Sequence, residues 1–369
     1  MKIKNVMLLL VILVLFAKCN TLNKTVGGGA NKPNTNGGGN GGAGGNSGGG
    51  GNQGNGNVGD EDMGGGVGPK DYTIETYAKG VTNWTGAKQD LTINIFKPAA
   101  SAEKLPCVIN VHGGGFAAGN KDRMNKFAKG FKDVNMVGIS VQYRLGFANS
   151  NLLTKCGAKP DDIEDASYRA IQDIRGAIRY VMHNADKLGI DKNKIYIGGA
   201  SAGAIGSMGV AFLDENEVPA RVKAKFGGID ASGDYQEEKI KIKGAYCFSG
   251  GYGNIDVFNN NVPVFFIHGN CDGVISPDVA PAYFCDASKG YPTAYGGNAV
   301  YEHLRKNNVC SAGIIYCGGG HVGKSAGAGE ILPDIIKFFQ DIEKGNCPTE
   351  RITRQAAKNN CSNAYSLCK

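Results

Sequence analysis

Ser201 stands at the centre of Gly199-Ala-Ser-Ala-Gly203, which has the G-x-S-x-G spacing of a nucleophilic serine on a tight turn. The run 194–198 before the motif predicts a buried strand, and the residues after it begin a helical pattern. The outer glycines allow a turn sharp enough to present the hydroxyl at the strand end. The alternative is an ordinary glycine turn with a capping serine. Partial matches such as Ser249 arise easily in a chain with 58 glycines.

A serine hydroxyl needs a general base to become nucleophilic at neutral pH, and the chain has five histidines. His183 and His303 fall within predicted helices, where they serve as surface or packing residues. His112 opens a glycine run, and His268 ends a predicted strand. His321, in the glycine-rich stretch YCGGGHVG, is therefore the candidate base. The alternative is a loop histidine that caps the final helix.

The third candidate is an acid that orients the imidazole and stabilises its cation. Asp272 lies in HGNCDGVISP, in the turn after a predicted strand. Asp278 and Asp286 are close enough in sequence to compete for this role. The alternative for Asp272 is a hydrogen-bonded turn aspartate.

The stretch NVHGGGFAAG, residues 110–119, follows a predicted strand directly. A tetrahedral oxyanion needs preorganised backbone N–H donors, and consecutive glycines let amides turn inward without a Cβ in the way. Taken alone, three glycines are also compatible with a flexible loop. Their place after an early core strand favours an oxyanion-binding role.

The rest of the sequence predicts alternating strands and helices that would position these residues. Apolar runs and helical spacing predict strands at 91–96, 106–111, 136–141, 194–198, 245–248, 262–268 and 313–317, and helices at 162–188, after 201, at 297–306 and at 331–343. Such alternation predicts an α/β fold with a mostly parallel central sheet and helices on both faces. Sites in such sheets form beyond the carboxyl ends of the strands.

The segments VHGGGFAAG, VQYRLGF, DKNKIYIGGASAGA, HGNCDGVISP and GGGH follow one another in this chain. This series resembles the α/β-hydrolase carboxylesterases and lipases, including type-B carboxylesterases and the branch similar to hormone-sensitive lipase. The resemblance covers residues 93–339. It implies an α/β-hydrolase fold and two-step acyl transfer that needs no cofactor and no metal.

The resemblance also implies roles for individual residues. The implied catalytic residues are Ser201, Asp272 and His321, and the implied oxyanion-hole donors are the amides of Gly114, Gly115 and Ala202. Tyr143 and Arg144 match a structural motif of the family. Ala204 departs from the family, which often has a further glycine there, and the tail after Gly345 lies outside the resemblance.

The composition divides the chain into a signal peptide (1–19), a Gly- and Asn-rich disordered linker (20–68), a catalytic domain (69–345) and a cysteine-containing tail (346–369). The apolar run 6–17 is too short to cross a bilayer but suits an export signal. We therefore expect an exported protein, whether secreted, periplasmic or at the cell surface. Membrane attachment through a lipidated Cys19 stays open, because Lys18 stands where lipoprotein signals favour a small residue.

The chain has 11 cysteines, and three of them, Cys347, Cys361 and Cys368, lie in the polar tail. In an oxidising compartment such residues form disulfides that fix a poorly packed end. The absence of CxxC pairs and of a histidine cluster argues against a zinc site. The net charge of +7 comes without a basic block interleaved with aromatics, so nucleic-acid binding is not expected.

The substrate is less well specified by the sequence. We expect a short-chain or carbohydrate-linked ester, such as an acetyl or feruloyl ester. The alternatives are a peptidase or amidase with the same residues and a catalytically silent binding protein. The loops 146–160 and 227–239 are long enough to cover a site, and several loop aromatics are candidates either for its pocket or for packing, namely Phe116, Tyr252, Tyr291 and Tyr295.

Overall fold

The computed structural model of the protein describes residues 71–99, 103–361 and 366–368. The predicted signal peptide, the predicted linker and Cys19 lie outside the described residues. Within the described residues, no helix has both the length and the apolar character needed to span a membrane.

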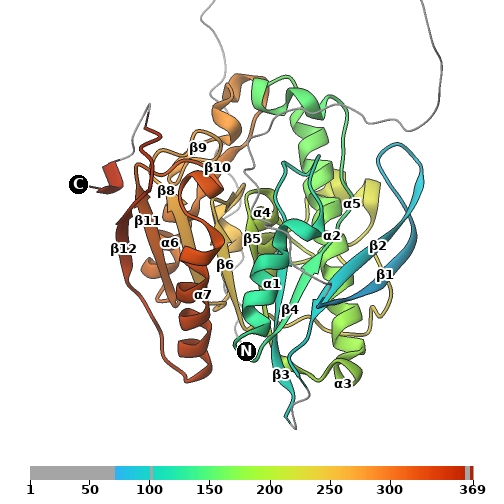
Figure 1. Cartoon of the computed structure of the whole chain (residues 1–369). Coiled ribbons are helices and arrows are strands. Elements are labelled where there is room, and N and C mark those ends of the chain that lie inside the picture. The colour runs from blue at the N-terminus through green and yellow to red at the C-terminus, as the bar shows by residue number, and fades with distance from the viewer. Residues whose placement is uncertain (1–70, 100–102, 362–365, 369) are drawn as a thin grey trace, which may run out of the picture. The chain divides into compact units, whose positions relative to one another are not determined.

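A nine-stranded sheet forms the centre of the structure, with the strand order β1-β2-β4-β3-β5-β6-β8-β11-β12 (Figure 1). Strand β2 runs antiparallel to both of its neighbours, and every pairing from β4 to β12 is parallel. The strands are β1 (Thr73–Thr82), β2 (Lys88–Phe96), β3 (Leu105–Val111), β4 (Val137–Val141), β5 (Ile190–Ala200), β6 (Gly244–Phe248), β8 (Val264–Gly269), β11 (Ser311–Cys317) and β12 (Arg351–Gln355). A mostly parallel sheet with covering helices confirms the predicted α/β-hydrolase fold.

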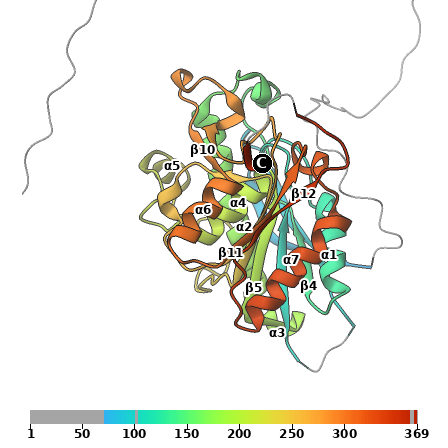
Figure 2. The same ribbon diagram turned by 90° about the vertical axis from the view of Figure 1, so that its left-hand side faces the viewer.

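Helices cover both faces of this sheet, as Figure 2 shows. They are α1 (Asn125–Lys132), α2 (Pro160–His183), α3 (Ala185–Leu188), α4 (Ala202–Phe212), α5 (Ala220–Phe226), α6 (Gly297–Lys306) and α7 (Ala328–Glu343). The side chains of α2, α4 and α6 belong to one hydrophobic cluster, and those of α1 and α7 belong to another. Three short strands, β7 (Gly251–Tyr252), β9 (Val279–Pro281) and β10 (Thr293–Gly296), form a separate small sheet.

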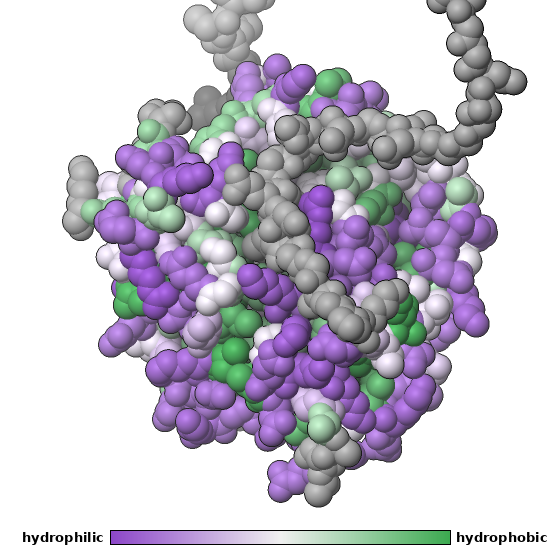
Figure 3. Space-filling view, in the orientation of Figure 1, coloured by the Kyte–Doolittle hydropathy of each residue, from purple (hydrophilic) through white to green (hydrophobic). Residues whose placement is uncertain are grey.

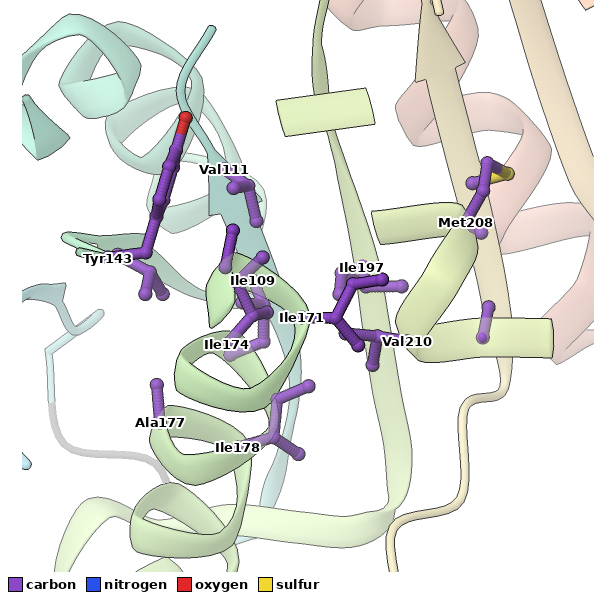
Figure 4. Close-up of a cluster of buried hydrophobic side chains, with 14 of the residues drawn as sticks. Ile109, Val111, Tyr143, Ile171, Ile174, Ala177, Ile178, Ile197, Met208 and Val210 are labelled. Atoms are coloured by element: carbon purple, nitrogen blue, oxygen red, sulfur yellow. The ribbon is translucent and has the colours of Figure 1, made fainter. Parts of the chain in front are cut away.

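Strand β3 explains why the core has two sides. Its successive side chains point to opposite faces, as in any strand. Ile109 and Val111 join the cluster on the α2 and α4 side, whereas Val108 joins the cluster on the α1 and α7 side. Figure 4 shows Ile109 and Val111 facing Ile174 of α2.

The face of the molecule shown in Figure 3 carries mainly hydrophilic side chains, with small hydrophobic groups between them.

The predicted elements recur with small shifts, and three differences have clear causes. Strand β1 was not predicted, and β12 lies beyond 313–317, the last strand that the sequence indicated. Both are edge strands with few buried side chains, so their apolar periodicity is weak. The predicted helix 162–188 divides at Asn184, whose side-chain amide donates to the carbonyl oxygen of Tyr180 at 2.8 Å.

Four disulfides join distant parts of the chain: Cys156–Cys285, Cys271–Cys361, Cys310–Cys347 and Cys317–Cys368. Each of the three tail cysteines is bonded to a cysteine of the preceding domain, which confirms the predicted attachment of the tail. Among the described cysteines, Cys107 and Cys247 are free, and both are buried.

Candidate active site

Ser201 lies at the turn between β5 and α4, at the carboxyl end of the parallel strands. Its backbone has φ 54° and ψ −123°, a conformation that L-residues rarely adopt. The turn is secured on the side of β6, where the N–H of Ser201 donates to the carbonyl oxygen of Phe248 at 2.9 Å. The residue is 7% exposed. The predicted sharp strand–turn–helix corner is therefore present, and it carries backbone strain.

Gly203 is required because α4 begins directly against the end of β3. A Cβ at this position would lie 2.5 Å from the carbonyl oxygen of His112 and still closer to that of Val111. We expect Gly203→Ala to lower the free energy of unfolding by about 1–3 kcal/mol and to lose activity, because backbone atoms cannot move aside as side chains do. Gly329→Ala, at a helical glycine with nothing near its Cβ, should change stability by less than about 1 kcal/mol. Chemical denaturation of the two variants measures the contrast, and equal stabilities would contradict it.

His321 lies between Ser201 and Asp272 and is hydrogen-bonded to both. Its Nε2 is 2.8 Å from Ser201 Oγ, and its Nδ1 is 2.8 Å from Asp272 Oδ2. His321 is 6% exposed and Asp272 is 1% exposed, so water is largely kept from both bonds. The structure thus brings the three predicted residues, separated by up to 120 positions in sequence, into one hydrogen-bonded chain.

Asp272 is held as a carboxylate. Burial alone raises the pKa of this carboxyl group, but the charge of His321 and hydrogen bonds from His268 and His321 outweigh burial and bring the pKa well below its ordinary value. The other oxygen, Oδ1, accepts the backbone N–H groups of Val274 at 2.8 Å and Ile275 at 3.0 Å. The same side chain therefore forms a hydrogen-bonded turn and faces the imidazole.

The two competing acids lie elsewhere. Asp278 accepts a hydrogen bond from the side chain of Asn298 at 2.5 Å. Asp286 is exposed and accepts the backbone N–H of Ser288 at 2.8 Å. Neither is hydrogen-bonded to His321.

The amides of Gly114, Gly115 and Ala202 are the donors that the resemblance implies for an oxyanion. None of the hydrogen bonds within the described residues uses their N–H groups. Gly114 and Gly115 have φ angles of 112° and 62°, which turn the loop after β3 in a way that glycine favours. Ala202 follows Ser201 at the first position of α4. Free N–H donors beside a serine hydroxyl are the arrangement that stabilises a tetrahedral oxyanion.

Sequence reasoning missed two residues that support this arrangement. Ser249, dismissed as a partial motif match, accepts the N–H of Val322 through its Oγ at 2.9 Å and so contacts the residue next to His321. His268 is fully buried, and its Nε2 lies 3.2 Å from Asp272 Oδ2. The position of His268, four residues before the acid at the end of a strand, was a usable signal for this contact.

The bonds around His268 fix its neutral tautomer. The N–H of Gly297 donates to Nδ1 at 3.3 Å, so Nε2 carries the proton. Nε2 lies 3.0 Å from the carbonyl oxygen of Ile275. It also faces Asp272 Oδ2, the oxygen to which His321 Nδ1 is hydrogen-bonded. His268 therefore donates toward the same carboxylate oxygen as His321.

Two segments come together beside Gly115. A Cβ at Gly115 would lie 2.7 Å from Leu153 Cδ2 and 3.8 Å from the hydroxyl of Tyr283. The segments that carry Leu153 and Tyr283 are joined by the Cys156–Cys285 disulfide. The loop 146–160 therefore reaches the site, as its length predicted.

The loop 227–239 does not serve as the second cover that its length suggested. It packs along α2 instead, where Ser232 Oγ donates to Asp173 at 2.5 Å and Asp230 pairs with Arg175 at 2.8 Å. Tyr291 is a packing residue, since its hydroxyl donates to the carbonyl oxygen of Ala158 at 2.7 Å.

The Tyr143–Arg144 pair has the structural place that the resemblance implied. The hydroxyl of Tyr143 donates to the carbonyl oxygen of His112 at 2.9 Å. Arg144 forms an ion pair with the fully buried carboxylate of Asp173 at 2.7 Å. These bonds tie the loop after β4 to the start of the glycine loop and to α2. Among the described residues, no group of three or more His, Cys, Asp or Glu side chains is placed to hold a metal ion.

Comparison with known proteins finds one matching family model and several esterases. Residues 93–245 match the model of the BD-FAE family. That segment contains the glycine loop and Ser201, whereas Asp272 and His321 lie beyond its end.

Three known proteins illustrate the similarity. Gut esterase 1 of Caenorhabditis elegans is 36% identical over 117 residues, which are 31% of this chain and 19% of the esterase. Carboxylesterase NlhH of Mycobacterium tuberculosis is 30% identical over 115 residues, 31% of each chain. The propionate-bound structure of an esterase from Thermogutta terrifontis aligns with a TM-score of 0.52 and 18% identity, over 74% of this chain and 94% of that one. The chain spans less than a third of the length of these curated relatives.

Proposed function

We propose that this chain is a serine carboxylic-ester hydrolase of the α/β-hydrolase carboxylesterase family and that it works through an acyl-enzyme. The observation that carries the proposal is the continuous hydrogen-bonded chain from Ser201 through His321 to the buried Asp272. The unpaired amides of the glycine loop beside it support the same reaction. In this proposal Ser201 is the nucleophile, His321 is the general base and Asp272 orients the imidazole.

The first half of the reaction forms the acyl-enzyme. Ser201 Oγ attacks the carbonyl carbon of the ester while His321 Nε2 accepts the hydroxyl proton. The carbonyl oxygen becomes negatively charged and accepts hydrogen bonds from the N–H groups of Gly114, Gly115 and Ala202. The tetrahedral intermediate then collapses, the C–O bond to the alcohol breaks, and His321 returns the proton to the leaving oxygen.

The second half repeats these steps with water. His321 takes a proton from a water molecule, whose oxygen attacks the acyl carbon. The second tetrahedral intermediate uses the same amides, and its collapse releases the carboxylic acid and restores the hydroxyl of Ser201. Because Asp272 stays ionised, it stabilises the imidazolium in both halves.

The proposed substrates are short-chain esters or acetyl and feruloyl esters linked to carbohydrate, outside the cytoplasm. Four disulfides among the described residues support export to an oxidising compartment. Attachment through a lipidated Cys19 remains part of the proposal. A screen of p-nitrophenyl esters of increasing chain length beside acetylated and feruloylated oligosaccharides tests the substrate class. Faster cleavage of an aminoacyl-anilide than of every ester would favour the peptidase or amidase alternative.

Leu153 is the side chain that we expect to limit acyl length, because it crowds Gly115. Leu153→Ala should raise the ratio of kcat/KM for p-nitrophenyl hexanoate to that for the acetate by about tenfold, since methylene groups gain a space from which they were excluded. Leu152→Ala is the matched control, because Leu152 lies in the same 3-10 turn, η2 (Ser150–Lys155), but contacts Gly157 instead. An equal change in both variants would rule out a specific role for Leu153.

A further inference from the structure

The chain adds a last strand after α7. It returns along the sheet as β12, whose residues 351–355 pair in parallel with residues 313–317 of β11 (Figure 2). The contact continues past β12, since the N–H of Ala356 donates to the carbonyl oxygen of Cys317 at 2.9 Å. We name residues 351–361 the C-terminal strap. This strap extends beyond the carboxyl end of β11, the end of the parallel strands at which the active-site loops lie.

Asn360 of the strap joins the two ends of the loop 318–324, which carries His321. Its backbone N–H donates to the carbonyl oxygen of Gly318 at 2.8 Å. Its side-chain amide donates to the carbonyl oxygens of Gly318 at 3.2 Å and Lys324 at 3.0 Å. One asparagine therefore ties the residue where the loop begins to the residue where it ends.

The loop and the strap also pack closely. A Cβ at Gly318 would lie 3.4 Å from the Cα of Asn359, and one at Gly320 would lie 3.3 Å from the Cβ of Asn360. Three consecutive glycines precede the histidine, and glycine loses more conformational freedom on ordering than any other residue. Contacts from outside the loop offset that loss, and the strap supplies several of them.

A disulfide joins the strap to the loop that carries the acid. Cys361 is bonded to Cys271, the residue directly before Asp272. The N–H of Cys271 also donates to the carbonyl oxygen of Gly319 at 2.8 Å. Cys271 therefore contacts both the strap and the histidine loop, and it lies next to the carboxylate.

We propose that the C-terminal strap is a positioning element for His321, acting through Asn360 and the Cys271–Cys361 disulfide. The inference rests on the proposed esterase function and adds to it a segment that lies outside the hydrolase resemblance. The strap holds the loop that carries His321 against the loop that carries Asp272. At that separation the imidazole reaches both the serine and the carboxylate. It acts through the loop backbone and does not touch the reacting atoms.

The groups that face the imidazole come from three places. Ser201 directly precedes α4 and bonds Nε2, whereas Asp272 follows β8 and bonds Nδ1. His268 of β8 contacts the same carboxylate oxygen, with its Nε2 at 3.2 Å. A shift of the loop relative to Asp272 therefore changes how well the imidazolium is stabilised, which a pH profile measures.

The test compares Cys361→Ser with Cys347→Ser in the full chain, together with Asn360→Ala. Each serine variant removes one disulfide between the tail and the preceding domain and leaves one partner thiol. Cys347, however, is bonded to Cys310 at the opposite end of β11 from the histidine loop. The two serine variants therefore differ mainly in which end of the strand is released.

We expect Cys361→Ser and Asn360→Ala to lower kcat for p-nitrophenyl acetate about tenfold while KM stays within about twofold. The acid limb of kcat/KM should move to lower pH, because a displaced carboxylate stabilises the imidazolium less. Cys347→Ser should keep kcat within about twofold and leave the limb in place, although thermal unfolding should report a loss of stability for both serine variants.

The possible results separate this proposal from the esterase proposal. If a fluorophosphonate labels Ser201 of the parent chain, but both strap variants keep the parental kcat and pH profile, the strap proposal is wrong and the esterase proposal stands. An equal fall of kcat in Cys347→Ser would also overturn it, since that result indicates general destabilisation. A parent chain that neither hydrolyses esters nor reacts with the probe would overturn both.

Discussion

Ser201→Ala is expected to lower kcat for ester hydrolysis by roughly 10⁴- to 10⁶-fold while leaving the fold intact. In the proposed mechanism the hydroxyl oxygen forms the acyl-enzyme, and no other side chain is hydrogen-bonded to His321 Nε2 in the described part of the chain. Alanine fits the turn without new contacts, so the free energy of unfolding should change little. Steady-state kinetics with p-nitrophenyl acetate and a denaturation curve measure the two effects.

Ser207→Ala is the matched control for this change. Ser207 lies in α4, the helix that follows Ser201. It is fully buried, and its hydroxyl donates to the carbonyl oxygen of Gly203 at 2.8 Å. It should lose at most about 1 kcal/mol of stability and keep most of its activity. Near-parental hydrolysis by Ser201→Ala would remove the basis of the proposed function, and so would fluorophosphonate labelling that persists in that variant.

Asp272→Asn is expected to lower kcat by about 10⁴-fold at neutral pH. The amide cannot stabilise the imidazolium, and an N–H facing Nδ1 favours the wrong tautomer of His321. Hydrolysis measured from pH 5 to 9 should show the loss throughout this range, because the carboxyl group that the variant replaces is ionised at every pH within it.

The sign of the stability effect follows from the lowered pKa of Asp272. A carboxyl group whose pKa is lower in the folded than in the unfolded chain stabilises the fold above its unfolded pKa. That contribution is lost only as the pH falls through the folded value. Asp272→Asn should therefore be less stable than the parent at neutral pH, with a difference that shrinks in strong acid.

Asp278→Asn is the control for the acid assignment, since Asp278 was a competing candidate. Its carboxylate accepts a hydrogen bond from the side chain of Asn298 and makes none to His321. The variant should therefore keep kcat within about tenfold of the parent. A larger loss in Asp278→Asn than in Asp272→Asn would reverse the assignment.

Much of the fold was predictable because its signals are local. The strands β3, β4, β6 and β8 are short apolar runs, and their alternation with amphipathic helices specifies a parallel sheet. The turn at Ser201 was predictable for the same reason, since its glycines, its strand and its helix are contiguous. Strands β1 and β12 were missed because an edge strand buries little and carries little periodicity.

The supporting residues of the site were not predictable in this way. Ser249 and His268 act through contacts with Val322 and Asp272, and the first of these pairs is 73 positions apart. No local pattern encodes the Ser249 contact, because serines at strand ends occur for many reasons, whereas the four-residue spacing of His268 and Asp272 is a local signal. The pairing of the cysteines was open for the same reason.

By itself the sequence predicted which side chains would carry the proposed chemistry and which kind of sheet presents them, because residue type and short-range spacing decide both. Only the tertiary structure decided which partners those side chains meet. It pairs His321 with Asp272 and not with Asp278 or Asp286, brings His268 to the same carboxylate oxygen, and brings the tail to the histidine loop. Those outcomes depend on the packing of segments far apart in the chain, whose free energy is a property of the assembled fold and of no single stretch of it.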